Sequence, residues 1–574
     1  MEQQPQNVNT NADVSEESKG DRKAMIETQA SSQKDELQSA PINELREDEQ
    51  VSTAAPSRRD KKPFSFYMSL ICLALLALIV AWDTTALSVA IPVIAAQLQA
   101  TTLEAFFASI AFTLAVAISQ PLYLSISDAI GRKAPLYVGM ILFTAGSIVF
   151  AVARSMTVLI VGRLIQGLGG GGLDILQEII IVDMTSLKER PMYLAVMALP
   201  IAVGSIMGPI IGALLCQFVT WRWLGWINLP FVGPAIPLAL LFMHLKPIDL
   251  DLKTKFRRLD WGGMFLFTVG STCVALPISW ADTLYPWGSW RTLLPLVIGI
   301  VAFIAFGFYE ARPVQPMLPY RLFKNRTAVV SLIGGAIHGL LLFSLLLYLP
   351  LFFQAVYLQT PLESAVSILP ACVVSVAFSV FAPVCVELTR RYTLMLHTGW
   401  VILTLFIGLW CAVDQTSSKA VKDTFLVFVG IGLGIVFQTV PFPLQASVEE
   451  ADDSGRVVGL LVIVRFLGGV LGLAIGSVVF NSGFAHQIAA FGPLPAEVSQ
   501  LSDPRQAIGF IPTLRTLHLD AETTWRLTEA YRIPFRTVWI VMASISGVGL
   551  ITSLLTRQLD LEKENLGRQR FDDS

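Results

Sequence analysis

Three ionisable side chains lie inside the apolar stretch that runs from Val161 to its terminal Asp183 and is long enough to cross a bilayer. They are Arg163, Asp174 and Glu178. Charged groups inside a membrane are costly, and they mark ion pathways, proton relays or buried ion pairs. In a helix, Arg163 and Asp174 differ by about 20° around the axis and about 16 Å in depth, and Glu178 follows one turn later. The spacing therefore predicts one polar face, suited to pairing charges and to binding protons, which partner helices or water must cover.

A second apolar stretch contains the best candidate partner for Arg163. Asp83, in the sequence AWDTTALSVAIPVIA, lies at about the depth of Arg163 because the two predicted spans run antiparallel. Arg465 is another isolated charge, in VIVRFLGGVLG, and no acid in the second half of the chain is an obvious partner for it. Gln354 and Gln438 are its candidate polar neighbours. We therefore expect an Asp83–Arg163 pair in the first half and a candidate cavity with Gln354 and Arg465 in the second.

Each of these charged residues also has a purely structural interpretation. A buried Asp83–Arg163 pair holds two helices together without moving protons. Asp174 and Glu178 could instead lie solvated at the inner mouth of the bundle. His338, in another apolar stretch, has two interpretations, a proton relay or an ordinary packed histidine. The sequence alone leaves these alternatives open.

The glycine run 169–172 has a packing explanation rather than a catalytic one. It follows no strand and has no Gly-Lys-Ser/Thr ending, so it is not a phosphate-binding loop. Small residues instead let a neighbouring helix approach closely. The chain also has no metal-ligand spacing and no nucleophile constellation, so we expect neither an enzyme nor a cofactor, and no metal site.

Composition indicates a polytopic membrane protein. The chain has 574 residues, of which 54% are hydrophobic and 15% charged, with a mean hydropathy of +0.62; soluble domains carry roughly 25% charged residues. The net charge of −2 gives no indication of nucleic-acid binding. All six cysteines fall in or at the ends of apolar runs, so no disulfide framework is expected.

Hydropathy predicts an all-α chain of about 14 transmembrane helices. The predicted spans are 67–91, 103–124, 135–153, 157–182, 192–216, 226–245, 261–279, 292–309, 328–353, 364–386, 394–413, 424–444, 455–480 and 536–556. Lys and Arg concentrate in alternate short loops, beginning with RRDKK before the first span, which predicts that both termini are cytoplasmic.

The same pattern predicts the order of the parts along the chain. They are a disordered cytoplasmic tail (1–63), a six-helix bundle (64–245), linkers with two extra helices (246–327), a second six-helix bundle (328–557) with an extracellular loop (481–535), and a cytoplasmic C-terminal tail (558–574).

Several short motifs together resemble the major facilitator superfamily, and more specifically its fourteen-span fungal drug:proton antiporter branch. SDAIGRK is similar to the cytoplasmic signature, RLIQGLG to the proton-coupling motif and GSIMGPIIGA to the antiporter motif. Their residues are Asp128, Gly131, Arg132 and Lys133; Arg163, Gln166, Gly167 and Gly169; and Gly204, Gly208, Pro209 and Gly212. Two positions depart from the family pattern, Leu124 and Ala213, where glycine is usual.

The resemblance implies two six-helix bundles around a central cavity, with the two extra helices between them and alternating access by rocking of the bundles. It implies a proton-driven efflux pump for small amphipathic organic compounds such as toxins, secondary metabolites or antifungal drugs. Asp83 is the first choice for the proton-carrying acid and Asp174 the second. Phe106, Phe107, Phe343, Phe352 and Phe353 are candidates for lining the pocket, with core packing as their alternative. We expect a monomer in the cell membrane, with the vacuolar membrane as the alternative.

Two other functions stay open at this point. One is proton-coupled transport of siderophores or amino acids at the plasma or vacuolar membrane. The other is a transporter-like solute sensor, which a long signalling tail favours; here the N-terminal tail has about 63 residues and the C-terminal one is short. The antiporter-like glycines argue against import.

Overall fold

The described part of the chain folds almost entirely into helices. The computed structural model describes residues 62–185, 190–245, 259–281, 284–312, 320–447, 453–492 and 494–559. Among these residues, 14 helices are long and apolar enough to cross a membrane, which confirms the predicted all-helical fold. The predicted tails lie outside the described residues except at their edges, as does the basic segment 253–258.

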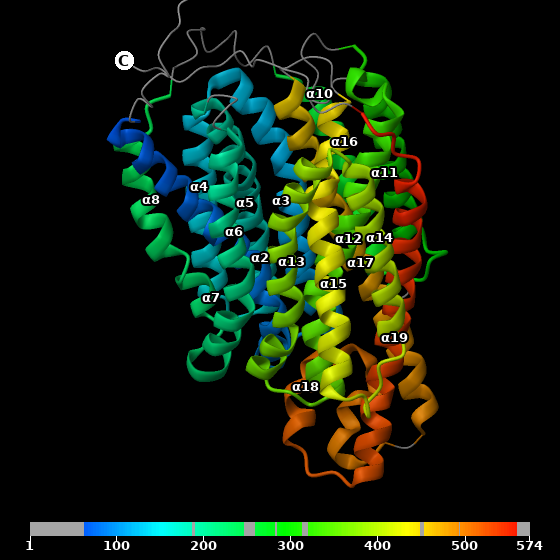
Figure 1. The fold of residues 1–574 in the computed structure, drawn as a ribbon. Helices are drawn as coiled ribbons and strands as arrows, with labels where there is room; N and C mark the ends of the chain where they lie inside the picture. The colour runs from blue at the N-terminus through cyan, green and yellow to red at the C-terminus, as the bar shows by residue number, and fades with distance from the viewer. Residues whose placement is uncertain are drawn as a thin grey trace, which may run out of the picture. The chain divides into compact units, whose positions relative to one another are not determined.

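Six spans make up the first half of the bundle (Figure 1). They are α2 (Phe64–Leu98), α3 (Thr102–Ile130), α4 (Lys133–Ala151), α5 (Met156–Met184), α6 (Arg190–Leu214) with the π-helical turn η1 (Leu215–Val219), and the pair α7 (Trp223–Trp226) and α8 (Leu229–Phe242). Helix α5 packs against α3 and α4, and α6 packs along α2. The first of these contacts fixes the charged face of α5 against neighbouring helices rather than lipid.

Two further helices precede the second half. Helix α10 (Trp261–Trp280) pairs with α11 (Trp290–Tyr309), and α10 also packs against α3 and α17. The second half contains η2 (Tyr320–Phe323), α12 (Arg326–Val356), α13 (Pro361–Thr389), α14 (Tyr392–Trp410), α15 (Lys419–Thr439), α16 (Pro441–Ala446), α17 (Asp453–Phe491) and α19 (Ala521–Ser553). The extra pair thus contacts both halves through α10.

The first hairpin of each half has the same local construction. Gln99 and Leu358, in the turns, have φ values of 50° and 54°. The following helices, α3 and α13, each begin with a capping box in which a threonine and a glutamate three residues later satisfy each other's backbone N–H groups. The two threonines are Thr101 and Thr360. Both helices have 29 residues, so the two halves repeat a common starting unit.

The predicted loop at 481–535 is largely helical. Helix α17 continues to Phe491, α19 begins at Ala521, and between them lie η3 (Ala496–Ser502), η4 (Pro504–Gln506) and α18 (Ala507–Thr516). The rings of Phe484 and Tyr531 pack together at a tilt, with their centroids 4.6 Å apart, so the extended ends of α17 and α19 support each other. Hydropathy marks where the apolar run ends, but it does not report a helix that tertiary packing prolongs.

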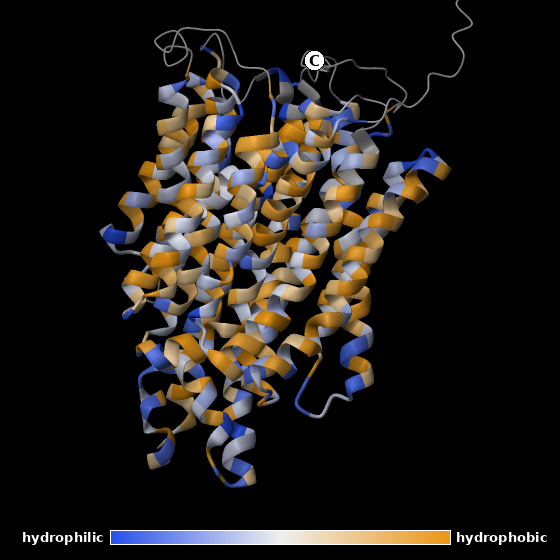
Figure 2. Ribbon diagram, turned by 90° about the vertical axis from the view of Figure 1, so that its left-hand side faces the viewer, coloured by the Kyte–Doolittle hydropathy of each residue, from blue (hydrophilic) through white to orange (hydrophobic). Residues whose placement is uncertain are grey.

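The outer surface matches a bilayer environment. Figure 2 shows hydrophobic residues over much of the helix lengths and hydrophilic residues gathered towards the two ends of the bundle. On α11, for example, Val297, Val301 and Phe308 are exposed, as expected for a face that contacts lipid. Following the predicted cytoplasmic position of the termini, we call the end where α2 begins the inner end and the opposite end, which carries α18, the outer end.

The two halves meet at the outer end. Gln354 of α12 donates hydrogen bonds to the carbonyl of Val89 in α2, at 3.2 Å, and to Ser364 Oγ in α13, at 3.1 Å. Val89 also belongs to a small apolar cluster with Ala213 of α6 and Ala365 of α13. These contacts join helices of both halves, so the described conformation is closed on the outer side.

Candidate functional site: two groups of intramembrane charges

The first charged group lies inside the first half. Arg163 of α5 donates a hydrogen bond from Nη1 to Asp83 Oδ2 of α2, and the two form an ion pair. The same Nη1 donates to Gln166 Oε1 at 2.9 Å, and Gln166 Nε2 donates to Asp83 Oδ1 at 2.8 Å. The structure therefore brings together Asp83, Arg163 and Gln166 in one closed network.

Two polar residues that the sequence did not single out complete this network. Asn228, between α7 and α8, donates to Asp83 Oδ1 at 3.1 Å and to Ser147 Oγ of α4 at 3.2 Å. Gln166 also donates to Ser147 Oγ, at 2.9 Å. The only signal in the sequence was a polar residue inside an apolar run, which does not reveal which helices meet.

Burial gives this network a strong structural role. Asp83 is 5% exposed and Arg163 2% exposed, and the Arg163 guanidinium lies 4.0 Å from the ring centroid of Phe112. Removing one partner of a buried pair leaves an uncompensated charge, at a cost of about 3–5 kcal/mol. The network therefore ties α2, α4, α5 and the α7–α8 segment together through interactions that are costly to break.

The glycines of α5 allow this close arrangement. A Cβ at Gly167 would lie 2.5 Å from the carbonyl oxygen of Phe112 in α3, and one at Gly172 would lie 2.6 Å from the ring of Tyr123. Gly169 approaches the backbone of α4 at Phe143 in the same way. Any larger side chain at these positions forces the helices apart, so the glycine run serves packing on two neighbouring helices.

The second charged group lies where the halves face each other. Asp174 Oδ2 accepts a hydrogen bond from Gln120 Nε2 of α3 at 2.8 Å. Asp174 and Glu178 both interact electrostatically with Arg465 of α17, in the other half. Both acids are partly accessible, unlike Asp83. The second half has no obvious acidic partner for Arg465, and the first half provides these two acids instead.

Arg465 is held without a bonded anion among the described residues. Its Nη2 donates to the carbonyl of Phe437 at 2.9 Å, and its guanidinium lies 4.1 Å from the centroid of that ring. Its Nε is buried and has no hydrogen-bond partner among the described atoms. His338 lies nearby, fully buried, with Nε2 3.1 Å from the Leu433 carbonyl and its ring 5.7 Å from that of Phe437. Arg465 therefore faces the first half as a desolvated cation.

Gln354 does not belong to this group. It lies near the outer end of α12, with Val89 and Ser364 as its hydrogen-bond partners. The Arg465 surroundings are instead built from α12, α15 and α17. Spacing along the chain could not distinguish these two locations because both residues lie in long apolar runs.

The inner-end motif forms its own ion-pair cluster. Arg132 pairs with Asp128 through Nη1 and donates from Nε to Asp183 Oδ2 at 3.0 Å. Burial by itself lowers the pKa of Arg132, but the carboxylates of Asp128 and Asp183 raise it above its ordinary value. Gly131 provides the turn, with a φ of 98° that residues with a side chain rarely adopt. Lys133 is the first residue of α4, and its side chain forms no hydrogen bond or ion pair with the described residues. Asp183, at the end of α5, was not predicted to take part.

The antiporter-like glycines lie on the face of α6 that contacts α2. A Cβ at Gly204 would lie 2.6 Å from the carbonyl oxygen of Leu78, and Cβ atoms at Gly208 and Gly212 would collide with Thr85 and Ala86. Pro209 lies within the same helix. The three glycines therefore form one flat packing surface, as their spacing of four residues predicts.

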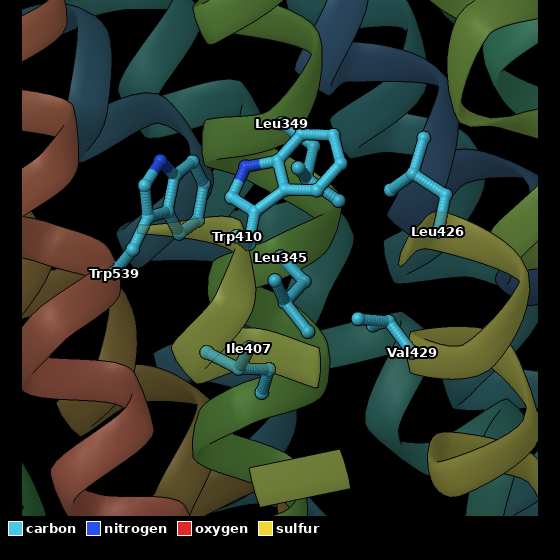
Figure 3. Close-up of a pocket in the computed structure, with 7 residues that line it drawn as sticks. All are labelled: Leu345, Leu349, Ile407, Trp410, Leu426, Val429 and Trp539. Carbon is cyan, nitrogen blue, oxygen red and sulfur yellow. The ribbon is translucent and has the colours of Figure 1, made fainter. Parts of the chain in front are cut away.

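Several of the candidate pocket aromatics are packed in the core. Phe352 and Phe353 contact the Trp410 ring at 6.1 Å, and Phe106 lies 5.6 Å from Tyr348. Figure 3 shows the neighbouring region, where Leu345, Leu349, Ile407, Trp410, Leu426, Val429 and Trp539 converge from α12, α14, α15 and α19. These side chains leave no room for a water-sized molecule, so this region is packed core. The described residues contain no cluster of His, Cys, Asp and Glu suited to a metal ion.

Comparisons with known proteins agree with this geometry. Residues 73–473 match the family model described as Major Facilitator Superfamily. The chain is 44% identical to the MFS-type transporter sphD of Aspergillus fumigatus over 90% of both chains. It is 31% identical to the acurin A biosynthesis cluster MFS-type transporter of Aspergillus aculeatus, over 88% of this chain and 91% of that one. It is 30% identical to the efflux pump FUS6 of Gibberella moniliformis, over 92% and 93% of the two chains.

A solved structure shares the fold at low sequence identity. The chain superposes on a bacterial homologue of the human lysosomal transporter Spinster, in an inward-facing conformation, with a TM-score of 0.57. The sequence identity is 15%, and the match covers 90% of this chain and 100% of the other. This likeness supports the helix arrangement described above.

Proposed function

Since the chain belongs to the major facilitator superfamily, we propose that it exports amphipathic organic compounds, such as secondary metabolites and toxins, in exchange for protons. The named relatives support export, because one is an efflux pump and another is the transporter of a biosynthesis cluster. The exchange with protons is supported by the second charged group. The pump would act as a monomer in the cell membrane with both termini in the cytoplasm.

The observation that supports the coupling is the packing of α17, which carries Arg465, against α5, which carries Asp174 and Glu178, together with the electrostatic interaction of these acids with Arg465. An alternating-access cycle needs a ligand that favours one arrangement of the halves over the other. Ionised acids attract Arg465 across the interface between the halves, whereas protonated acids do not. Protonation on the outer side and release on the inner side therefore bias the relative positions of the halves in opposite directions.

The smaller number of bonded partners favours these acids over Asp83 as the proton carriers. Asp83 is enclosed, is paired with Arg163 and accepts further hydrogen bonds from Gln166 and Asn228. Protonation of Asp83 would have to break its ion pair with Arg163. Asp174 accepts a single hydrogen bond, from Gln120, and both it and Glu178 are partly accessible. We therefore assign coupling to Asp174 and Glu178 and structural support to the Asp83 network.

The function is tested with purified protein in liposomes that carry an imposed pH gradient. Substrate movement and proton flux are recorded together for a panel of fluorescent amphipaths, siderophores and amino acids. Each exchanged proton supplies about 1.4 kcal/mol per pH unit, enough for about a tenfold substrate gradient. We expect amphipaths to accumulate against their gradient with matching proton counterflow. Substrate movement that does not depend on the pH gradient would instead indicate a facilitator. Selective transport of siderophores or amino acids would show that the proposed substrate class is wrong.

A further inference from the structure

A short amphipathic helix closes the outer end of the bundle. Helix α18 buries the apolar side chains of Ile508, Phe510, Ile511 and Leu514, each at most 3% exposed. It packs against α2 and α3 of the first half and against α12 of the second. Figure 1 shows α18 at the end of the bundle opposite the start of α2. The helix therefore spans the junction between the two halves.

On the first half, the contact centres on one hydroxyl group. Thr102, the first residue of α3, donates from Oγ1 to the Arg505 carbonyl at 2.8 Å and accepts from the Ile508 backbone N–H at 3.2 Å. The second bond satisfies a backbone N–H in the first turn of α18, which has no partner within the helix itself. Beside it, a Cβ at Gly509 would lie 3.6 Å from Ala100 O and from the backbone carbon of Ala95, in ordinary contact.

On the second half, α18 is held by the chain itself as well as by hydrogen bonds. The segment is joined covalently to α17 and α19, which both belong to that half. Tyr531 of α19 donates to the Ala507 carbonyl at 2.7 Å, and Arg515 donates to the Gln359 carbonyl at 3.2 Å. If the halves separate at the outer end, α18 must follow the second half and leave the first.

We propose that α18 is an outer latch, which holds the first half closed through Thr102 and the α2–α3 hairpin and releases it when the transporter opens outward. This inference rests on the proposed alternating-access export. The latch adds to that proposal a specific contact, between α18 and the first half, whose breakage limits outward opening. The Gln354–Val89 contact between the halves has to break in the same step.

A reversible cross-link tests the latch directly. Gly509→Cys is paired with Ala95→Cys or Ala100→Cys in a background in which the six native cysteines are replaced. Oxidation is expected to lower efflux in liposomes at least tenfold, and reduction to restore it. The controls are the three single-cysteine variants under the same oxidation, which cannot form the cross-link and whose efflux is expected to be the same before and after oxidation. Full efflux from the cross-linked protein, or failure of both pairs to cross-link, would overturn the latch.

A distance measurement separates the latch from the export activity. Spin labels on Gln99→Cys and Thr513→Cys, both exposed positions, report the gap between the α2–α3 hairpin and α18. We expect a second, longer distance at high pH, because ionised Asp174 and Glu178 attract Arg465 in the inner half of the bundle and so favour opening at the outer end. This distance is expected to be more populated in Thr102→Val, which loses both hydrogen bonds, and unchanged in Thr102→Ser. One short distance under all conditions contradicts the latch even if efflux is intact. A releasing latch in a protein that moves no amphipath contradicts the proposed function alone.

Discussion

The two groups of intramembrane charges differ in whether the arginine bonds a carboxylate. Asp83 and Arg163 are bonded to each other and to Gln166, whereas Arg465 faces acids that it does not bond among the described residues. Their depths in antiparallel spans were enough to predict the first pair. They were not enough to predict Asn228, because its contact depends on how four helices meet. The partners of Arg465 were missed because they come from the other half of the chain.

Charge balance in the Asp83 network is testable by paired substitution. Arg163→Gln leaves Asp83 buried and unpaired, so we expect a loss of about 3–5 kcal/mol in stability, seen as a lower Tm in detergent. Adding Asp83→Asn removes the unpaired charge and is expected to recover most of that loss. The double variant is also expected to keep pH-dependent efflux, at a reduced rate. A well-folded double variant whose efflux no longer responds to pH would return the coupling role to Asp83.

At the scale of elements, small residues determine how closely the helices pack. The regular spacing of Gly204, Gly208 and Gly212 predicted a flat face, and the structure places that face on α2. The sequence did not predict α18 or the outer extensions of α17 and α19. Their helices form through long-range packing, such as that of Phe484 on Tyr531, which hydropathy along the chain does not detect.

The α2–α6 contact is tested by adding one methyl group. In Gly204→Ala, the new Cβ would lie 2.6 Å from the Leu78 carbonyl oxygen, so the helices must separate. We expect a destabilisation of about 1–3 kcal/mol and a faster proton leak through the liposome-reconstituted protein. Gly233→Ala in α8 is the matched control, because nothing lies within 4 Å of its Cβ position. Equal Tm and leak in the two variants would show that close packing at Gly204 is unimportant.

At the scale of the whole molecule, the fold was largely predictable because membrane-spanning helices need about 20 apolar residues each. The 14 spans follow directly from that requirement. What the sequence left open was which faces meet between the halves. Contacts such as Gln354–Val89 and Thr102–Ile508 link residues far apart in the chain. No local pattern encodes them, yet they determine which side of the transporter is closed.

The central claim is that Asp174 and Glu178 carry the protons that drive export. The most direct test compares two assays in liposomes for wild type, Asp174→Asn, Glu178→Gln and the double variant. One assay is pH-driven accumulation, and the other is substrate counterflow without a pH gradient. Glu387→Gln, which removes an exposed acid of α13, is the control. We predict that the double variant keeps counterflow but loses pH-driven accumulation and proton flux. Accumulation and proton flux at wild-type levels in the double variant would contradict the account.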